Sequence, residues 1–517
     1  MHGTLVSGSD TRRAAGWLVA ILVLAALLRL SALAKPLYID EIVSITVAVQ
    51  PLAEMAGVMR QIDASPALYP VLLHAWLSLA DADVWARLLS ALAGILTVLV
   101  VWLIGRRYFS ERAGLYAAGI AAIAPAHVHY SQYVRSYAFL GLFATLYLWC
   151  ALDWFSERGR RPAIPWWTVT LAAVGLIYTH YLALLVFVAT TAVAVLHWRR
   201  SPCVVARWAG AHVLAAVLFL PGLPLFLHNL ETDRVRDVQR GEPPSPHVLL
   251  PNLIAELSLG QRALGFDDPT VRRTVFAAAA VLFPALFLVG LRAGFRERPY
   301  ATLLAAAFFW LPVLLYVLAG RRLVAVRFFV PFLAGYFLVL GQGLATLKPR
   351  AQVAGAAALA LVSFVPLAHF YSSYSWSYDH RTVARAIAER LTPGDRLLVV
   401  HPYEAFYYRR YLGPSTPITG LVFTALENQP GYVIKPRDLD VELAKPIVRK
   451  AARHSHNLWV IGQSTRSFAS DAGQQAALLE WMDTELGPGA VFDDLTGGDP
   501  AIRLYAGAAP PDESAER

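Results

Sequence analysis

The dominant pattern in the sequence is a series of long apolar runs separated by short polar segments. About 20 apolar residues in a helix cross a hydrocarbon core of roughly 30 Å. Runs of this length or somewhat shorter recur at residues 14–33, 84–104, 113–125, 134–151, 166–178, 182–197, 208–227, 275–289, 301–318, 328–344 and 353–370. They predict an all-α polytopic membrane protein with about eleven transmembrane helices.

Basic residues follow every second run, and they suggest how the chain is oriented. The clusters are Arg106, Arg107 and Arg112; Arg158, Arg160 and Arg161; Arg199, Arg200 and Arg207; Arg292, Arg296 and Arg298; and Lys348 and Arg350. If every run crosses, all of them share one side with Arg12 and Arg13, and the positive-inside rule makes that side cytoplasmic. This parity favours a tight hairpin near Thr179 over the alternative of one bent helix between residues 166 and 197.

Composition excludes several classes of protein. With 57% hydrophobic and 16% charged residues, the chain is too apolar for a soluble multidomain enzyme. Its formal charge of +9 reflects the basic clusters between runs, so no nucleic-acid partner is expected. Two cysteines, Cys150 and Cys203, support neither a disulfide framework nor a cysteine metal cage. The first run exceeds the usual signal-peptide core of about 7–15 residues, which favours an uncleaved helix; cleavage after Ala34 is the alternative.

Two segments outside the membrane have structure of their own. The first external loop, residues 35–83, contains amphipathic stretches at 43–59 and 68–79 that suit the membrane interface. In the tail, residues 381–391 have helical spacing, Pro393-Gly394-Asp395 predicts a turn, and residues 396–401 predict a buried strand. We therefore expect a transmembrane domain over 1–370, an extracytoplasmic α/β domain over 371–506 and a disordered tail over 507–517.

Acidic residues in the first external loop are candidates for chemistry. Asp40 and Glu41 lie just past the first run, where ionisable residues are candidate functional groups. Asp40 could also cap the helix after it, and Glu41 could be a helix-start charge or orient its neighbour. Asp63 either caps the helix that starts near Pro66 or contacts an acceptor.

Cations and aromatic residues on the same side form a second group of candidates. Arg135 lies in a Tyr-, Ser- and Gln-rich segment, where a buried cation is costly unless it meets an anion such as phosphate; snorkelling to headgroups is the alternative. Arg327 has the same two interpretations, and Arg321 and Arg322 are expected to be interface anchors. No metal is expected, because the histidines at 127, 129 and 180 lack a carboxylate or cysteine that would complete a zinc site.

Four segments together carry a resemblance to a known family. They are Asp40-Glu41, Asp63-Ala-Ser-Pro-Ala-Leu-Tyr-Pro70, the run from Val84 to Arg107, and Tyr130-Ser-Gln-Tyr-Val-Arg-Ser-Tyr137. They resemble the GT-C type membrane glycosyltransferases related to dolichyl-phosphate-mannose protein mannosyltransferases, whose bacterial relatives transfer aminoarabinose, galacturonic acid or mannose. The similarity is close over residues 37–155 and extends as a pattern to 370. Arg327-Phe-Phe-Val-Pro-Phe332 is similar to a late family element, with Phe328 where tyrosine is common.

The resemblance implies a function and a set of site residues. The donor would be a polyprenyl-phosphate sugar, the acceptor an envelope lipid, glycan or protein, and the reaction an inverting displacement in the inner membrane, surrounded by membrane lipids. The implied roles are catalysis for Asp40 and Glu41, donor-phosphate binding for Arg135 and Arg327, and acceptor or loop positioning for Asp63, Tyr69, His129 and Tyr137.

Two alternatives stay open at the level of the sequence. No cofactor is expected, although a metal-dependent variant could use Asp40, Glu41 and Asp63. A membrane transporter or lipid flippase is the alternative function, and it would be expected to show internal repeats, of which the sequence gives no convincing sign. The identities of the sugar and of the acceptor do not follow from the sequence.

Overall fold

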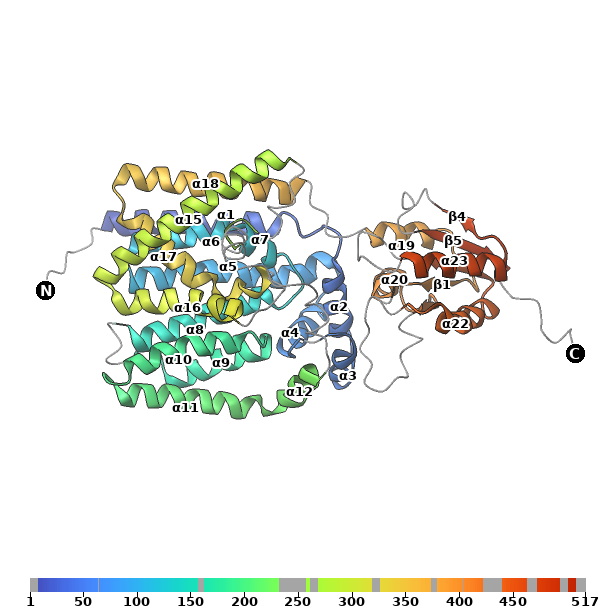
Figure 1. The fold of residues 1–517 in the computed structure, drawn as a ribbon, viewed down its shortest axis with the longest axis horizontal. Coiled ribbons are helices and arrows are strands. Elements are labelled where there is room, and N and C mark those ends of the chain that lie inside the picture. The colour runs from blue at the N-terminus through green and yellow to red at the C-terminus, as the bar shows by residue number, and fades with distance from the viewer. Residues whose placement is uncertain are drawn as a thin grey trace, which may run out of the picture. The chain divides into compact units, whose positions relative to one another are not determined.

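The structure is a computed structural model that describes residues 8–63, 65–156, 162–231, 257–260, 268–318, 326–372, 379–401, 403–421, 439–462, 472–492 and 501–507. The chain divides into two compact units (Figure 1). Met1–Ala34 and Ser65–Tyr374 form the first, called the membrane unit here. Lys35–Ala64 and Ser375–Arg517 form the second, called the α/β unit.

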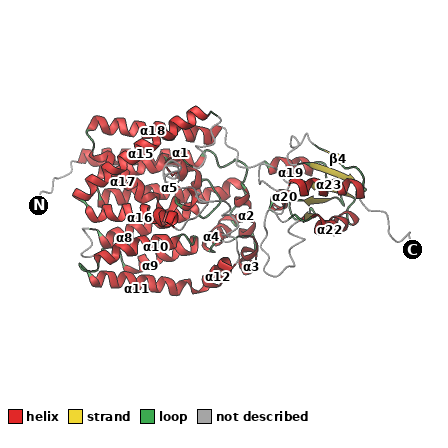
Figure 2. Cartoon of the chain, viewed as in Figure 1, coloured by secondary structure: helices red, strands yellow, loops and turns green. Residues whose placement is uncertain are grey.

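The membrane unit is built from helices throughout its described residues (Figure 2). They are α1 (Gly8–Leu30), α4 (Leu68–Leu77), α5 (Asp83–Tyr108), α6 (Glu111–Ile123), α7 (Pro125–Ser131), α8 (Tyr137–Phe155), α9 (Trp166–Thr179), α10 (Ala183–His197), α11 (Pro202–Phe219), η1 (Leu220–Gly222), α12 (Leu223–Glu231), α15 (Pro269–Glu297), α16 (Pro299–Leu318), η3 (Val326–Phe328), η4 (Val330–Phe332), α17 (Leu333–Thr346) and α18 (Pro349–Ser372). Each of the eleven apolar runs in the sequence contains one of these helices.

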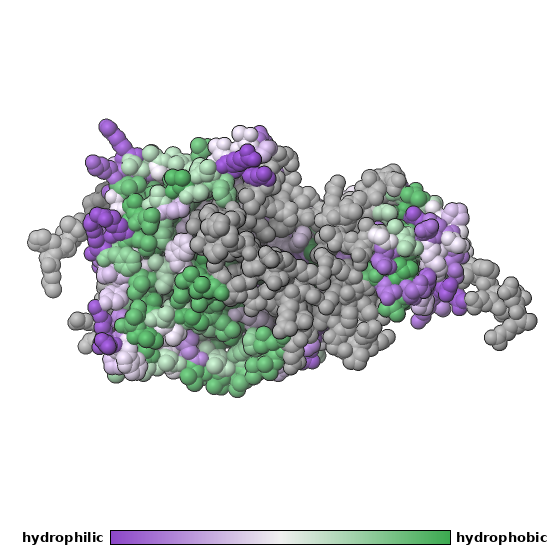
Figure 3. Space-filling model, viewed as in Figure 1, coloured by the Kyte–Doolittle hydropathy of each residue, from purple (hydrophilic) through white to green (hydrophobic). Residues whose placement is uncertain are grey.

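Several helices are suited to a lipid environment. In the described part of the chain, six are long and apolar enough to cross a membrane: Arg12–Leu30, Asp83–Tyr108, Tyr137–Phe155, Pro202–Leu230, Pro269–Glu297 and Pro349–Ser372. Large apolar side chains such as Val281 and Leu288 of α15 lie on the surface, and Figure 3 shows a band of apolar residues across part of the membrane unit. The protein is therefore a multi-pass membrane protein. The number of crossings, about eleven, stays a prediction because helices such as α9 and α17 are shorter than a full span.

Small residues allow the central helices to pack closely. A Cβ atom on Gly105 of α5 would lie 2.4 Å from the Cα of Gly114 in α6, and one on Gly341 of α17 would lie 2.5 Å from the Ala113 carbonyl. Between α15 and α17, a Cβ on Gly290 would overlap the Val339 carbonyl. Such contacts are typical of membrane helices, whose association depends on close van der Waals packing.

Two of the basic clusters make defined contacts at helix ends. The Arg107 guanidinium at the end of α5 lies 3.0 Å from the Asp153 carboxylate near the end of α8. Arg200, between α10 and α11, lies 4.3 Å from the ring of Tyr300 at the start of α16. Two separate helices, α9 and α10, are joined by residues 180–182, as the predicted hairpin requires. Arg158, Arg160 and Arg161 lie outside the described residues.

The α/β unit contains a five-stranded sheet of order β2-β1-β3-β5-β4. The strands are β1 (Arg396–Val399), β2 (Ile418–Gly420), β3 (Asn457–Ile461), β4 (Ala490–Val491) and β5 (Ile502–Ala506), and the helices are α2 (Ile39–Ala48), α3 (Leu52–Ile62), α19 (His380–Ala388), α20 (Glu404–Leu412), α22 (Val441–Arg453) and α23 (Ala472–Leu486). β1 pairs in parallel with β2 and β3, whereas β5 is antiparallel to β3 and β4. One apolar core contains α22 and α23, and another contains α19 and α20.

The predicted helix, turn and strand at the start of this unit are present as α19, a turn and β1. Gly394 has φ of +90°, a backbone conformation that favours glycine. The Asp395 carboxylate accepts hydrogen bonds from the Thr392 N–H at 2.9 Å and from Trp459 Nε1 at 3.2 Å. Burial alone would raise the pKa of Asp395, but these hydrogen bonds hold that pKa below its ordinary value.

Two sequence-based expectations need correction here. The stretch 43–59 is not one helix, because α2 ends at Ala48 and α3 begins at Leu52, after Pro51, whose ring disfavours helical backbone at the residue before it. The second is the grouping of the first loop: residues 35–64 group with the C-terminal residues, although the first unit ends at Tyr374, close to the expected boundary at residue 370. The reason is tertiary: α2 packs against α20. Residues 508–517 of the expected tail lie outside the described residues.

Candidate active site

The two acids at the start of α2 have different environments. Tyr38 precedes the first helical residue, and its N–H donates to Glu41 Oε2 at 2.8 Å. Glu41 is 1% exposed, whereas Asp40 is partly exposed. Glu41 thus satisfies one of the N–H groups that a helix start leaves without an intrahelical partner. Of the pair, Asp40 is the carboxylate that solvent can reach.

The third acid, Asp63, lies at the end of α3, where its backbone is extended and its side chain is buried. It does not cap α4, because that helix begins at Leu68 and Ala67 occupies the capping position. The capping interpretation of Asp63 is therefore wrong. A contact with an acceptor stays a prediction.

Arg135 lies in the turn between α7 and α8, and the turn is firmly anchored. Gln132 Nε2 donates to the Leu28 carbonyl at 2.6 Å and to the Tyr371 hydroxyl at 3.1 Å, which ties the turn to α1 and α18. The Arg135 N–H donates to the Tyr133 carbonyl at 2.7 Å. The Arg135 side chain is half-buried. The turn thus presents a cation at the edge of the helical core.

Arg327 belongs to a segment that the fold brings to the same helices. It lies in η3, which contacts α7, and the following η4 packs against α8. Its guanidinium carbon lies 5.4 Å from the centre of the Phe328 ring, and the side chain is half-buried. The helices flanking the Arg135 turn are therefore also those contacted by the Arg327 segment. Arg321 and Arg322 lie outside the described residues.

Aromatic side chains surround this turn. His129 lies 4.7 Å from Tyr130 and 5.3 Å from Phe370, measured between ring centres. Tyr137 stacks near Tyr133 at 6.3 Å. These rings form the wall beside the Arg135 turn, and the structure brings together two of the predicted positioning residues, His129 and Tyr137.

Tyr69 is placed in the packing between α4, α5 and α8. It is buried, its hydroxyl lies 3.2 Å from Ser90 Oγ, and its ring lies 5.9 Å from that of Phe139. These contacts support the position of α4 and leave little of the Tyr69 surface for an acceptor. Of the two predicted roles of Tyr69, acceptor positioning and loop positioning, these contacts favour loop positioning.

Sequence reasoning did not identify the buried cation Arg29. This side chain is 0% exposed near the end of α1 and donates to the carbonyls of Ala121 and Ala122, both at 3.0 Å, at the end of α6. It also lies 2.6 Å from His127 Nδ1, which must accept because a guanidinium only donates. Arg29 thus stabilises the break before Pro125 from which α7 and the Arg135 turn follow. An arginine inside an apolar run was the signal that could have revealed it.

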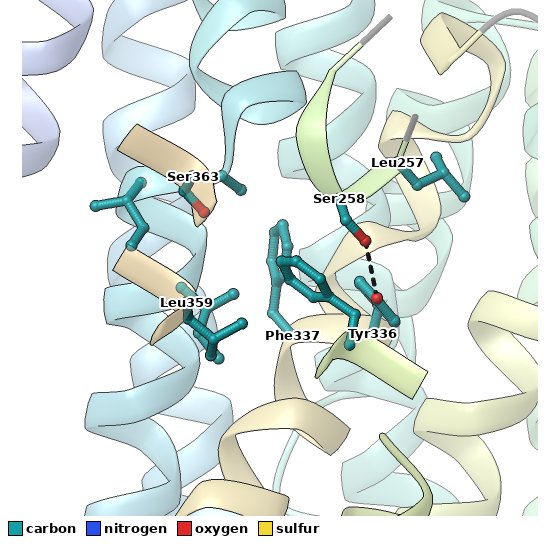
Figure 4. A pocket seen from close by; sticks show the side chains of 10 residues that line it. Leu257, Ser258, Tyr336, Phe337, Leu359 and Ser363 are labelled. Atoms are coloured by element: carbon teal, nitrogen blue, oxygen red, sulfur yellow. Dashed lines mark hydrogen bonds between the residues drawn. The ribbon is translucent and has the colours of Figure 1, made fainter. Parts of the chain in front are cut away.

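No group of three or more His, Cys, Asp or Glu side chains suited to a metal ion occurs among the residues that the structure describes. One narrow cavity lies between α6, α15, α17 and α18 (Figure 4). Its wall is almost entirely apolar, with the Tyr336 hydroxyl 3.0 Å from Ser258 Oγ. None of the predicted site residues lines this cavity.

Comparisons with known proteins agree with this architecture. The family model "dolichyl-phosphate-mannose-protein mannosyltransferase" matches residues 64–224. The apo crystal structure of ArnT from Cupriavidus metallidurans aligns with a TM-score of 0.62 at 17% identity, covering 96% of this chain and 99% of that one. The same protein bound to undecaprenyl phosphate gives 0.60 at 16% identity, with coverages of 96% and 98%.

A more distant structure shares the fold. The apo oligosaccharyltransferase from Archaeoglobus fulgidus aligns with a TM-score of 0.51 at 12% identity, covering 92% of this chain and 72% of that one. No curated protein matches the chain by sequence. The chain thus has the GT-C fold of membrane glycosyltransferases, and its residues 64–224 match the mannosyltransferase family model.

Proposed function

We propose that this protein transfers a sugar from a polyprenyl-phosphate donor to an acceptor hydroxyl in the cell envelope. The observation that carries the proposal is that the Arg327 segment contacts α7 and α8, the two helices on either side of the Arg135 turn, inside a unit of GT-C fold. The similar ArnT structure with bound undecaprenyl phosphate supports a lipid phosphate as the donor class.

The two arginines suit the leaving group of such a reaction. A lipid-linked sugar phosphate releases a polyprenyl phosphate, whose negative charge increases as the bond to the anomeric carbon breaks. Guanidinium groups donate parallel hydrogen bonds to phosphate oxygens and stay charged at any physiological pH. Arg135 and Arg327 would therefore bind the donor and stabilise the departing phosphate without a cofactor.

Asp40 supplies the remaining chemical role in the proposal. Its carboxylate removes the proton of the acceptor hydroxyl, while that oxygen forms a bond to the anomeric carbon and the phosphate–carbon bond breaks. The configuration at the anomeric carbon inverts, the proton remains on Asp40, and the phosphate remains on the lipid. Glu41 has an orienting role in this proposal, because its buried carboxylate accepts from the Tyr38 N–H at the start of α2.

The proposed location follows from charge. The basic helix ends are assigned to the cytoplasm, which puts the Asp40 loop, the Arg135 turn and the C-terminal α/β residues on the extracytoplasmic side of the inner membrane. The acceptor is then an envelope lipid, glycan or protein, and Asp63, His129 and Tyr137 are proposed to position it or the surrounding loops.

Mass spectrometry of envelope lipids and glycans tests the proposal. Cells without the gene are expected to lack one hexose-, pentose- or uronate-sized increment, which the wild-type gene restores and the Asp40→Asn gene does not. A transporter or flippase would also cause a missing increment, but both genes would restore it. Restoration by Asp40→Asn, or no missing increment, would therefore contradict the proposed transfer.

A further inference from the structure

The start of α2 is attached to the C-terminal part of the α/β unit by a buried hydrogen bond. The Tyr407 hydroxyl of α20 donates to the Leu37 carbonyl at 3.1 Å. Tyr407 and Leu37 are each 1% exposed. Helices α2 and α20 also pack against one another. The chain that precedes Asp40 is therefore held by a side chain 370 residues further along the sequence.

The ring of Tyr407 has a fixed orientation. It stacks on His380 with ring centres 4.2 Å apart and an angle of 18° between the rings. His380 is 1% exposed, and burial lowers its pKa to about 3, so it presents an uncharged ring at physiological pH. A buried tyrosine whose ring is already stacked loses little further conformational entropy when its hydroxyl donates a hydrogen bond.

A short rigid stretch connects this hydrogen bond to Asp40. The Tyr38 carbonyl accepts from the N–H groups of Glu41 at 2.9 Å and Ile42 at 3.0 Å, and the Tyr38 N–H donates to the Glu41 side chain. These bonds fix the first turn of α2, in which Asp40 is the second residue. Since the turn moves as one body, holding the Leu37 carbonyl also fixes the location of the Asp40 carboxylate.

We propose that Tyr407 is a positioning residue for Asp40, so that the C-terminal α/β residues hold the base of the reaction in its working position. This inference rests on the proposed function, in which Asp40 removes the acceptor proton. Misplacing a reacting group by about 1 Å can cost as much as 100-fold in rate, so even a modest loosening of α2 has a measurable effect.

The chain offers a closely matched pair of variants. Tyr407→Phe removes the hydroxyl that holds Leu37 and keeps the ring on His380. Tyr408→Phe is the control, because the Tyr408 hydroxyl is also buried and lies 3.2 Å from His380 Nδ1, on the same helix. Both full-length proteins are purified, their thermal unfolding is compared, and kcat and KM are measured with a synthetic polyprenyl-phosphate sugar and an acceptor extract.

Tyr407→Phe is expected to lower kcat about tenfold at unchanged donor KM, and Tyr408→Phe is expected to retain wild-type kcat. A second measurement isolates the route through Asp40. In an Asp40→Asn background, Tyr407→Phe should cause no further loss, because the group that it positions is absent. A merely structural tyrosine would instead lower the residual activity by the same factor in both backgrounds.

The outcomes separate this inference from the proposed function. If Asp40→Asn loses about 100-fold or more and Tyr407→Phe behaves like Tyr408→Phe, the positioning role is wrong and the base assignment stands. Equal losses from Tyr407→Phe with and without Asp40 also overturn the positioning role. If Asp40→Asn keeps normal turnover, the base assignment fails, and the positioning role fails with it.

Discussion

Replacing each acid of the Asp40-Glu41 pair separately should produce opposite effects on activity and stability. Glu41 is buried and its Oε2 accepts from the Tyr38 N–H at 2.8 Å, whereas Asp40 is partly exposed. Glu41→Gln keeps an acceptor oxygen for this bond and removes the charge. Asp40→Asn keeps the size of the side chain and removes the proton acceptor.

The expected magnitudes follow from these contacts. A hydrogen bond to a charged group contributes about 1.5–3 kcal/mol and one between neutral groups about 0.5–1.5 kcal/mol, so Glu41→Gln should lower the free energy of unfolding by about 1–2 kcal/mol. The loss of a negative charge at the helix start is included in that range. Turnover of Glu41→Gln should stay within about threefold of wild type, while Asp40→Asn should lose about 100-fold or more.

Initial rates and thermal unfolding of the purified variants measure both quantities. Rates are taken with saturating polyprenyl-phosphate sugar, and unfolding is followed in the same detergent. The assignment is refuted if Glu41→Gln loses 100-fold in rate while Asp40→Asn remains active. That result would make Glu41 the base in spite of its bond to the helix start.

Three further variants or probes address other parts of the account. Arg135→Lys should lower turnover at least about tenfold, which corresponds to about 1.4 kcal/mol of transition-state binding, because lysine cannot make the bidentate contact with phosphate. The control is Arg106→Lys in the last turn of α5, where the arginine is half-exposed; this variant should remain fully active. Cys203 is exposed and Cys150 buried, so an impermeant thiol reagent should label Cys203 only after the cells are permeabilised; labelling of intact cells would invert the orientation. Asp395→Asn should destabilise the α/β unit by about 1–3 kcal/mol near pH 7. The pKa of Asp395 is lower in the folded than in the unfolded protein, so the stability difference between wild type and Asp395→Asn should shrink as pH falls below about 4. A stability difference that persists at pH 2 would contradict a stabilising role of the Asp395 charge.

Local sequence patterns predicted most elements of the membrane unit. Every apolar run overlaps a helix, because a helix that is in contact with lipid or buried along its whole length needs an apolar stretch of similar length. Arg107 at the end of α5 and Arg200 between α10 and α11 lie in the polar segments that separate the apolar runs. Pro51 is a local signal for the break between α2 and α3. The amphipathic spacing conceals this signal, because it continues on both sides of the proline and predicts one stretch over residues 43–59.

The parts that sequence did not reveal depend on contacts between distant residues. Arg29 is stabilised by carbonyls at 121 and 122, and no pattern within its own run identifies those partners. The attachment of Leu37 to Tyr407 spans 370 residues and regroups the first loop with the C-terminal residues. At the start of α2, the sequence shows the acid pair but not the difference between its members: Glu41 is buried and accepts from the Tyr38 N–H, whereas Asp40 is partly exposed.

Turnover of a defined donor by the purified protein tests the central claim most directly. A radiolabelled polyprenyl-phosphate sugar is reconstituted with the protein and an envelope extract, and free polyprenyl phosphate and labelled acceptor are both quantified. The proposed transfer predicts that the two products appear in equal amounts with the wild-type protein and that both fall by about 100-fold or more with Asp40→Asn. Movement of intact donor across the bilayer without release of polyprenyl phosphate would contradict it and identify a lipid transporter instead.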